Sequence, residues 1–208
     1  MPESPITRFI VSLPIFLLAI TLHEVGHAWV AYKCGDDTAK RLGRVTLSPI
    51  AHLDPLGSLM FVISSFTYVG FGWAKPVPVA VERLRNPRRD DILVSLAGVT
   101  ANLLQAIAWS VLFRLGRVYL TGSLGSAIVT FCFLGVFVNV MLMVFNLLPI
   151  PPLDGSHVAL NLLGIRNPYT IARFTGIGSL LLFLLVTTHA FGLLFSGVIE
   201  PIIYLLLR

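Results

Sequence analysis

The feature that most constrains this chain is a group of ionisable side chains inside a segment apolar enough for a lipid bilayer. Arg8 to Tyr32 is almost continuously apolar, yet it contains His23-Glu24-x-x-His27. A helix of this length reaches about 37 Å at about 1.5 Å per residue, enough to cross a membrane. Ionisable groups are costly in lipid unless they have partners. The rest of the sequence must therefore supply partners for this group.

Composition places the whole chain in a membrane. Of its 208 residues, 56% are apolar and only 12% are charged, whereas soluble domains carry about 25% charged residues. The net charge of +5 comes from basic residues clustered between apolar segments, a pattern typical of cytoplasmic loops near anionic lipid. No groove-reading or stacking element accompanies these clusters, so we expect no nucleic-acid partner. The two cysteines, Cys34 and Cys132, are too few for a disulfide framework.

Hydrophobic patterning predicts an all-α polytopic membrane protein, a bundle of about four to six transmembrane helices in a single domain over residues 1–208. Spans are expected over residues 8–32, 92–113 and 127–148, with one or two more after residue 174. Residues 47–80 mix proline, glycine and β-branched residues around an apolar centre too short to span. We expect a re-entrant segment or β-hairpin there, entering and leaving the membrane on one side.

Loop charges predict how the bundle is oriented. Residues 114–126 and 153–173 are expected as polar connections. If the 47–80 segment is re-entrant, the basic clusters on either side of it share one side, which the positive-inside rule makes cytoplasmic. The half of the first span that carries the two histidines then lies on the same side as Asp154. We expect this polar group nearer the cytoplasmic side of the cell (inner) membrane.

The spacing of His23 and His27 is typical of a metal site on a helix. Residues four apart stack on one face with their Cβ atoms about 5–6 Å apart, so both imidazoles can bind one zinc ion at about 2.0–2.1 Å. Glu24 then lies beside the ion, where it can act as a general base. Five histidines and four glutamates in this chain give roughly 0.002 chance matches to the pattern. Two merely structural histidines are the less favoured interpretation.

A catalytic zinc needs a third protein ligand and keeps one position open. The acidic or histidine candidates in apolar surroundings are His52, Asp54, Asp154, His157, His189 and Glu200. Asp154 fits best, because it follows the proline-rich end of a span on the predicted side. A carboxylate also balances charge, since Zn²⁺ with one carboxylate and one hydroxide is neutral. The alternative is a turn aspartate that binds backbone amides, as is common for Asp-Gly.

Three segments, HEVGH, SLAGVTANLL and NLLPIPPLDG, resemble in their order the site-2 protease family of intramembrane zinc metalloproteases. HLDPLG and GFGWAKPVPV also resemble segments of the short subgroup without a PDZ domain. The matches extend from His23 to Gly155, about two-thirds of the chain. The resemblance implies one zinc ion per chain on His23, His27 and Asp154, with Glu24 as general base. It implies hydrolysis of a peptide bond in or near a substrate's transmembrane segment, in regulated intramembrane proteolysis.

Three further residues are candidates for contact with the substrate or the oxyanion. Asn146 either donates to the oxyanion or bonds a neighbouring helix, and the resemblance suggests that it lines the site. Asn102 has the same two interpretations, and the small residues beside it favour packing. His52 either gates water or takes part in catalysis, or it fixes the turn before Pro55; the turn is favoured.

Two other functional classes compete with a protease. A metal transporter would also place histidine and aspartate in spans, but it would need ligands along a path and no general base. A non-catalytic membrane binding protein on a protease-like fold would not need an intact metal and base pattern. The expected partners are the lipid bilayer and a transmembrane protein substrate. The substrate's identity, the regulator and the oligomeric state are left open by the sequence.

Overall fold

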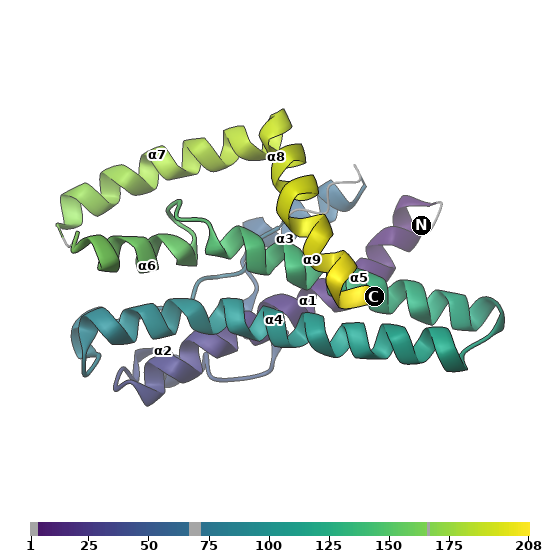
Figure 1. The fold of residues 1–208 in the computed structure, drawn as a ribbon. Helices are drawn as coiled ribbons and strands as arrows, with labels where there is room; N and C mark the ends of the chain where they lie inside the picture. The colour runs from purple at the N-terminus through teal and green to yellow at the C-terminus, as the bar shows by residue number, and fades with distance from the viewer. Residues whose placement is uncertain (1–3, 67–71, 166) are drawn as a thin grey trace.

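The structure is a computed structural model that describes the chain except for residues 1–3, 67–71 and 166 (Figure 1). Its helices are α1 (Pro5–Lys33), α2 (Thr38–Arg41), α3 (Pro55–Ser65), α4 (Pro87–Tyr119), α5 (Gly122–Leu147), α6 (Asp154–Leu163), α7 (Pro168–Thr187), α8 (His189–Leu194) and α9 (Glu200–Leu207). Two 3-10 turns, η1 (Pro49–His52) and η2 (Val81–Arg83), and a π-helical turn, η3 (Phe195–Ile199), lie between them. No strand occurs among the described residues.

Three helices, α1, α4 and α5, are long and apolar enough to cross a membrane. The all-α membrane fold is therefore confirmed, with three candidate spans in the described chain and shorter apolar helices beside them. α4 packs against both α1 and α5, and α5 runs back along α4 after a short connection (Figure 1). One buried apolar cluster joins α4, α5 and the last helical segment through Val99, Ala106, Val136, Val140, Ile199 and Ile203.

The predicted β-hairpin over residues 47–80 is wrong. Asp54 caps α3 by accepting a hydrogen bond from the Gly57 amide at 2.8 Å, and Pro55 occupies the first helical turn, where its missing N–H costs nothing. After α3 the chain comes back beside the residues that precede this helix, as an isolated bridge between Leu53 and Ala74 shows. Residues 67–71, between α3 and this bridge, lie outside the described residues. Whether the segment dips into a membrane stays a prediction.

Both expected polar connections are largely helical instead. α4 continues through Arg114 to Tyr119, and the Arg114 side chain donates to the carbonyl of Leu206 near the end of α9. The segment after the proline-rich stretch forms α6 directly from Asp154. It ends at Gly164, whose φ of +71° gives the left-handed cap that glycine adopts readily.

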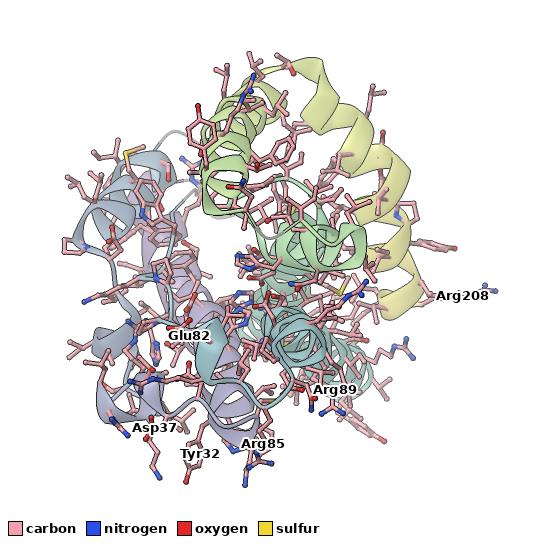
Figure 2. All side chains as sticks on the ribbon, turned by 90° about the vertical axis from the view of Figure 1, so that its left-hand side faces the viewer. Tyr32, Asp37, Glu82, Arg85, Arg89 and Arg208 are labelled. Carbon is pink, nitrogen blue, oxygen red and sulfur yellow. The ribbon has the colours of Figure 1, made fainter. Side chains whose placement is uncertain are left out.

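The two basic clusters share one end of the bundle, as the loop charges predict. The Arg83 guanidinium lies 3.3 Å from the Asp37 carboxylate, and the Arg85 amide donates to the Cys34 carbonyl at 2.9 Å. Figure 2 shows Tyr32, Asp37 and Arg85 with their side chains directed outward at this end. The charged loops therefore converge at the end of α1 that follows the two histidines.

Candidate metal centre

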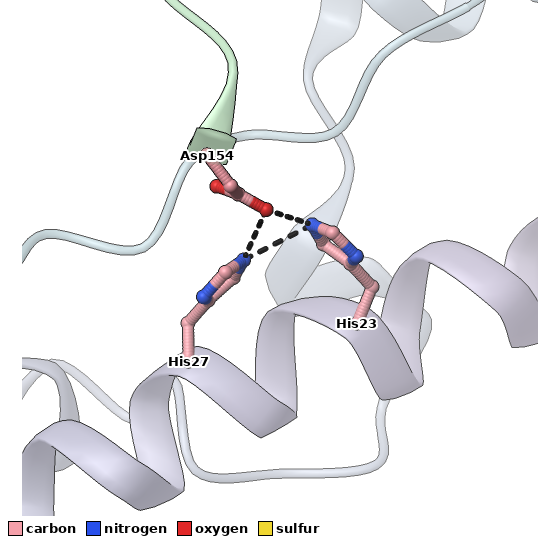
Figure 3. A group of neighbouring side chains, drawn as sticks. All are labelled: His23, His27 and Asp154. Carbon is pink, nitrogen blue, oxygen red and sulfur yellow. Dashed lines mark hydrogen bonds and ion pairs between the residues drawn. The ribbon is translucent and has the colours of Figure 1, made fainter. Parts of the chain in front are cut away.

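Three side chains from two distant segments meet at one point (Figure 3). His23 and His27 project from one face of α1, and Asp154 is the first residue of α6. The Asp154 Oδ2 atom lies 3.3 Å from Nε2 of each imidazole, and the two Nε2 atoms are 3.0 Å apart. Among the described residues, this is the group of histidine, cysteine and acidic side chains placed to hold a metal ion.

The spacing of these three atoms fits a tetrahedral zinc ion. Bonds of about 2.0–2.1 Å place the ligands of such an ion about 3.3 Å from one another, close to the observed separations of 3.0, 3.3 and 3.3 Å. Asp154 Oδ2 is buried and has no hydrogen-bond partner in the described chain. Two nitrogens and one carboxylate oxygen also leave the fourth position of a catalytic zinc free. The residues present therefore fit the metal that the sequence predicts.

The ionisation of Asp154 suits a metal ligand. Burial by itself would raise the pKa of this carboxyl, but the two imidazoles beside it, when protonated, hold the pKa well below its usual value. The side chain is therefore a carboxylate at neutral pH, with a negative charge directed at the point where the imidazoles meet. His23 and His27 are nearly inaccessible, at 8% and 7% exposed, so the centre lies inside the bundle.

Each imidazole is oriented by a hydrogen bond on its far side. His27 Nδ1 lies 2.7 Å from the Val94 carbonyl oxygen, and His23 Nδ1 lies 2.7 Å from Oδ1 of Asn102. Both partners are acceptors, so each Nδ1 carries the ring proton and each Nε2 presents a lone pair. Such partners set the tautomer and orientation of metal-binding histidines.

Gly98 of α4 makes room for both rings. A Cβ atom at this position would lie 2.6 Å from His23 Cε1 and would collide with Nε2 of His27. Only glycine lets α4 approach the histidines this closely. The Gly98-x-x-x-Asn102 element thus has two functions, because its glycine admits the imidazoles and its asparagine, fully buried, binds one of them.

Glu24 is held beside the centre by the segment that returns from α3. The Val77 amide donates to Glu24 Oε2 at 3.0 Å, and Glu24 is 7% exposed. The same segment is tied down on either side, where the Lys75 amide donates to the His52 carbonyl at 2.8 Å and the Ala80 amide to Asp36 at 2.7 Å. Residues 75–80 therefore run past the candidate base in a fixed position.

Asp36 anchors one end of that segment as a carboxylate. Its burial raises the pKa, but hydrogen bonds from Thr38 and from the Ala80 amide outweigh burial and hold the pKa below its usual value. This acidic residue was not among the candidates drawn from the sequence. Its position directly after α1 lets it join the end of the histidine helix to the returning segment.

The remaining sequence candidates lie in other settings. Asn146 donates to the carbonyl of Leu142 in its own helix at 3.0 Å, so its contact with an oxyanion stays a prediction. His52 is fully buried with Nε2 2.9 Å from the Thr46 carbonyl, which agrees with a role in fixing the turn. His157 lies on α6, with Nδ1 3.7 Å from Asp91. The side chain of His189 lies outside the described part.

Asn139 is a site residue that the sequence analysis missed. It is fully buried in α5 and accepts a hydrogen bond from Asn102 Nδ2 at 2.9 Å. The signal was available, because it is an amide in the middle of an otherwise apolar stretch, FCFLGVFVNVMLMVF. An isolated amide inside a membrane helix indicates a polar partner on a neighbouring helix.

Comparisons with known proteins converge on one family. The sequence profile described as peptidase family M50 matches residues 118–189, which include Asp154 but not the histidines of α1. The Bacillus subtilis protein named "Putative zinc metalloprotease YwhC" is 40% identical over 165 residues, covering 77% of this chain and 73% of that protein. No solved structure matches.

Two mycobacterial relatives named "Putative zinc metalloprotease Rip2" are more distant. The Mycolicibacterium smegmatis protein is 34% identical over 154 residues, which cover 74% of this chain and 58% of that protein. The Mycobacterium tuberculosis protein is 33% identical over 148 residues, which cover 71% and 55%. The chain thus spans somewhat more than half the length of the Rip2 proteins and about three quarters of YwhC.

Proposed function

The chain belongs to peptidase family M50, and from this premise we propose how its residues cleave a peptide bond within the membrane. It is an intramembrane zinc metalloprotease. The observation that carries this conclusion is the convergence of His23, His27 and Asp154 at tetrahedral spacing inside a bundle of membrane-length helices. When bound there, zinc polarises the scissile carbonyl and makes a water molecule more acidic.

Glu24 is proposed as the general base and acid. It is adjacent to His23 in sequence, and its carboxylate is oriented by the Val77 amide on Oε2. One carboxylate oxygen is therefore held while the other is left to take a proton from the attacking water. Glu24 then returns that proton to the amine that leaves when the carbon–nitrogen bond breaks. A positioned acid–base group of this kind contributes about 10²–10⁴-fold to the rate.

We propose a transmembrane protein as the substrate, cleaved in regulated intramembrane proteolysis. The metal centre is buried within helices that themselves cross a membrane, so the scissile bond must reach it from the same layer. A helical amide is shielded by its own hydrogen bonds, so the substrate segment must unwind locally. Its freed backbone groups then need partners where water is scarce.

We place the active site nearer the cytoplasmic side of the cell (inner) membrane. The support is the gathering of both basic clusters at the end of α1 that follows His27. Basic loops stay preferentially on the cytoplasmic side. Reporter fusions after Arg85 and in the α4–α5 connection would test this orientation, and a periplasmic position for Arg85 would contradict it.

The Glu24→Gln variant tests the proposed chemistry. We expect it to bind zinc as the wild type does and to lose cleavage of a model transmembrane substrate by about 10²–10⁴-fold. The measurements are zinc content and turnover in lipid nanodiscs, with Glu82→Gln, an exposed glutamate on η2, as the matched control. Cleavage at the wild-type rate would remove Glu24 from this role.

The same preparation separates the two competing functions. Zinc transport into vesicles that continues in Glu24→Gln would favour a transporter. Zinc binding without cleavage of any membrane substrate by the wild type would favour a non-catalytic binding protein. Family membership and the fixed Glu24 carboxylate favour hydrolysis over both.

A further inference from the structure

We propose that Asn139 of α5 is a positioning residue that sets the tautomer of the metal ligand His23, acting through Asn102. Neither asparagine belongs to the group of side chains placed to hold the ion. The proposal rests on the zinc site described above. It concerns how this chain keeps one histidine in the form that can bind metal.

The order of donors in this chain of hydrogen bonds is determined from its far end. Asn139 Nδ2 donates to the carbonyl of Gly135 at 2.9 Å, and a carbonyl can only accept. The Oδ1 of Asn139 must therefore face α4, where it accepts from Asn102 Nδ2 at 2.9 Å. The sequence of contacts thus fixes which way each amide points.

The orientation of Asn102 in turn fixes His23. Asn102 Nδ2 donates to Asn139 Oδ1 at 2.9 Å and, at the longer distance of 3.4 Å, to the Ala19 carbonyl, so Asn102 presents Oδ1 to His23 Nδ1 at 2.7 Å. An oxygen there can only accept, so Nδ1 carries the proton and Nε2 keeps its lone pair toward the metal. A flipped Asn102 amide would present N–H to Nδ1, and the ring proton would then occupy Nε2, where the ion has to bind.

Because the asparagines are buried, the orientation of the Asn102 amide must be fixed by other protein groups. Asn102 and Asn139 are both fully buried, so water cannot satisfy a misplaced amide, and an unpaired polar group in this environment is costly. The three residues come from three different spans, α1, α4 and α5. His27 needs no such device, because the Val94 main-chain carbonyl is an acceptor whatever side chain it carries.

The alternative is that Asn139 only joins two helices, an interaction worth about 0.6–2 kcal/mol in membranes. That role predicts a loss of stability alone. The proposed role predicts in addition a change in the His23 ring and in zinc affinity. The two are therefore separable by measurements that do not depend on catalytic activity.

The decisive variant is Asn139→Leu, measured in nanodiscs. We expect zinc affinity, from competition with a chelator, to fall about 10–100-fold. In the metal-free protein, nitrogen NMR of labelled histidine should show His23 with the proton partly on Nε2. Val140→Ala, at the adjacent and equally buried position, is the control, with lower stability but unchanged tautomer and affinity. Wild-type affinity and tautomer in Asn139→Leu would overturn the proposal.

A rescue by Asn102→Asp provides the sharper test. The carboxylate that this substitution introduces has an oxygen at both ends, as in carboxylate–histidine–zinc triads, so its orientation no longer matters. We therefore expect Asn102→Asp combined with Asn139→Leu to bind zinc as tightly as Asn102→Asp alone. A further loss of the same size as in Asn139→Leu would contradict a tautomer role.

A conservative variant covers the case in which Asn139→Leu does not fold. An aspartate buried without a neighbouring positive charge becomes neutral, unlike one that faces a metal-bound imidazole, so in Asn139→Asp the acid O–H can donate to Gly135 and the other oxygen can accept from Asn102. This variant should keep the wild-type tautomer and zinc affinity. A shift of the His23 proton to Nε2 in Asn139→Asp would count against the proposed chain of contacts.

Discussion

The histidine half and the aspartate half of the metal centre are built in different ways. His23 and His27 lie on a 29-residue span, buried against α4, and each has a hydrogen bond behind it. Asp154 opens a 10-residue helix after a proline-rich stretch. Helix packing therefore positions the first half, whereas loop geometry and polar contacts position the second. The histidines should accordingly be harder to displace than the aspartate. A substitution that alters the packing of α4 should also lower zinc affinity more than one that alters the loop before α6.

Polar contacts with the start of α4 hold the aspartate half. Arg88 donates through Nε to the Asn161 carbonyl at 3.0 Å, and Asn161 donates to the Asp91 carboxylate. His157 lies 3.7 Å from the same carboxylate. These contacts fix the C-terminal end of α6. The position of its first turn depends instead on the close approach of Gly155 to the carbonyls of Leu147 and Leu148. The two ends of α6 can therefore be tested separately.

The largest effect is expected from Gly98→Ala, which acts on the histidine half. Its Cβ would meet both imidazoles, so the rings or α4 must move. We expect zinc affinity to fall by about 100-fold and the free energy of unfolding to fall by about 1–3 kcal/mol, as for other overpacked sites. Chelator competition and thermal unfolding in nanodiscs measure the two quantities.

Gly176→Ala is the matched control, because a Cβ at this helical position meets nothing within 4 Å. It should leave zinc affinity unchanged. If Gly98→Ala bound zinc normally, the histidine half would be more adaptable than its packing indicates, and the contrast between the two halves would disappear.

A smaller effect is expected from Gly155→Ala, which acts on the aspartate half. The new Cβ would collide with the Leu147 carbonyl and lie 2.6 Å from the Leu148 carbonyl oxygen. Because α6 is short and follows a loop, we expect it to shift rather than destabilise the bundle. Zinc affinity should fall about 10-fold, with little change in thermal unfolding. A loss of stability as large as in Gly98→Ala would show that both halves are equally rigid.

The smallest effect is expected from pH, through His157. The Asp91 carboxylate, 3.7 Å away, raises the pKa of His157 above the ordinary value of 6.5, against the opposing effect of burial. The stabilisation is therefore complete below about pH 6.5 and is lost as pH rises through the raised value. Because the side chain is half exposed, it amounts to no more than about 1 kcal/mol. The protection factors of α6 amides, which are corrected for base-catalysed intrinsic exchange, should fall with rising pH in the wild type but not in His157→Gln.

Much of the site could be predicted because the types and spacing of its residues indicate metal binding. The spacing of His23 and His27 and the Asp-Gly after a proline-rich stretch indicate ligands directly, and the structure brings them together. The supporting contacts could not be found in the same way. Asn139 is recognisable only as an amide in an apolar helix, and its partner, Asn102, is fixed by how α4 and α5 pack.

The fold was less predictable where the amino-acid composition indicated a turn or loop but local capping residues favoured a helix. Residues 47–80 contain enough proline and glycine to indicate a hairpin, yet Asp54 and Pro55 form a helix start that outweighs them. The polar residues around Asp154-Gly155 likewise indicate a connection rather than a helix. Tertiary contact decides there, since Gly155 allows the first turn of α6 to lie against the end of α5.

The bond between His27 and the carbonyl of Val94 has a consequence for how such enzymes diverge. A main-chain carbonyl is present whatever side chain the residue carries. This hydrogen bond therefore requires no particular residue type at position 94. Position 94 can exchange one buried apolar side chain for another provided that the helix keeps its path, whereas exchanges at positions 102 and 139 must also preserve the order of donors and acceptors. Two ligands of one short motif thus impose unequal constraints on the sequences of descendants.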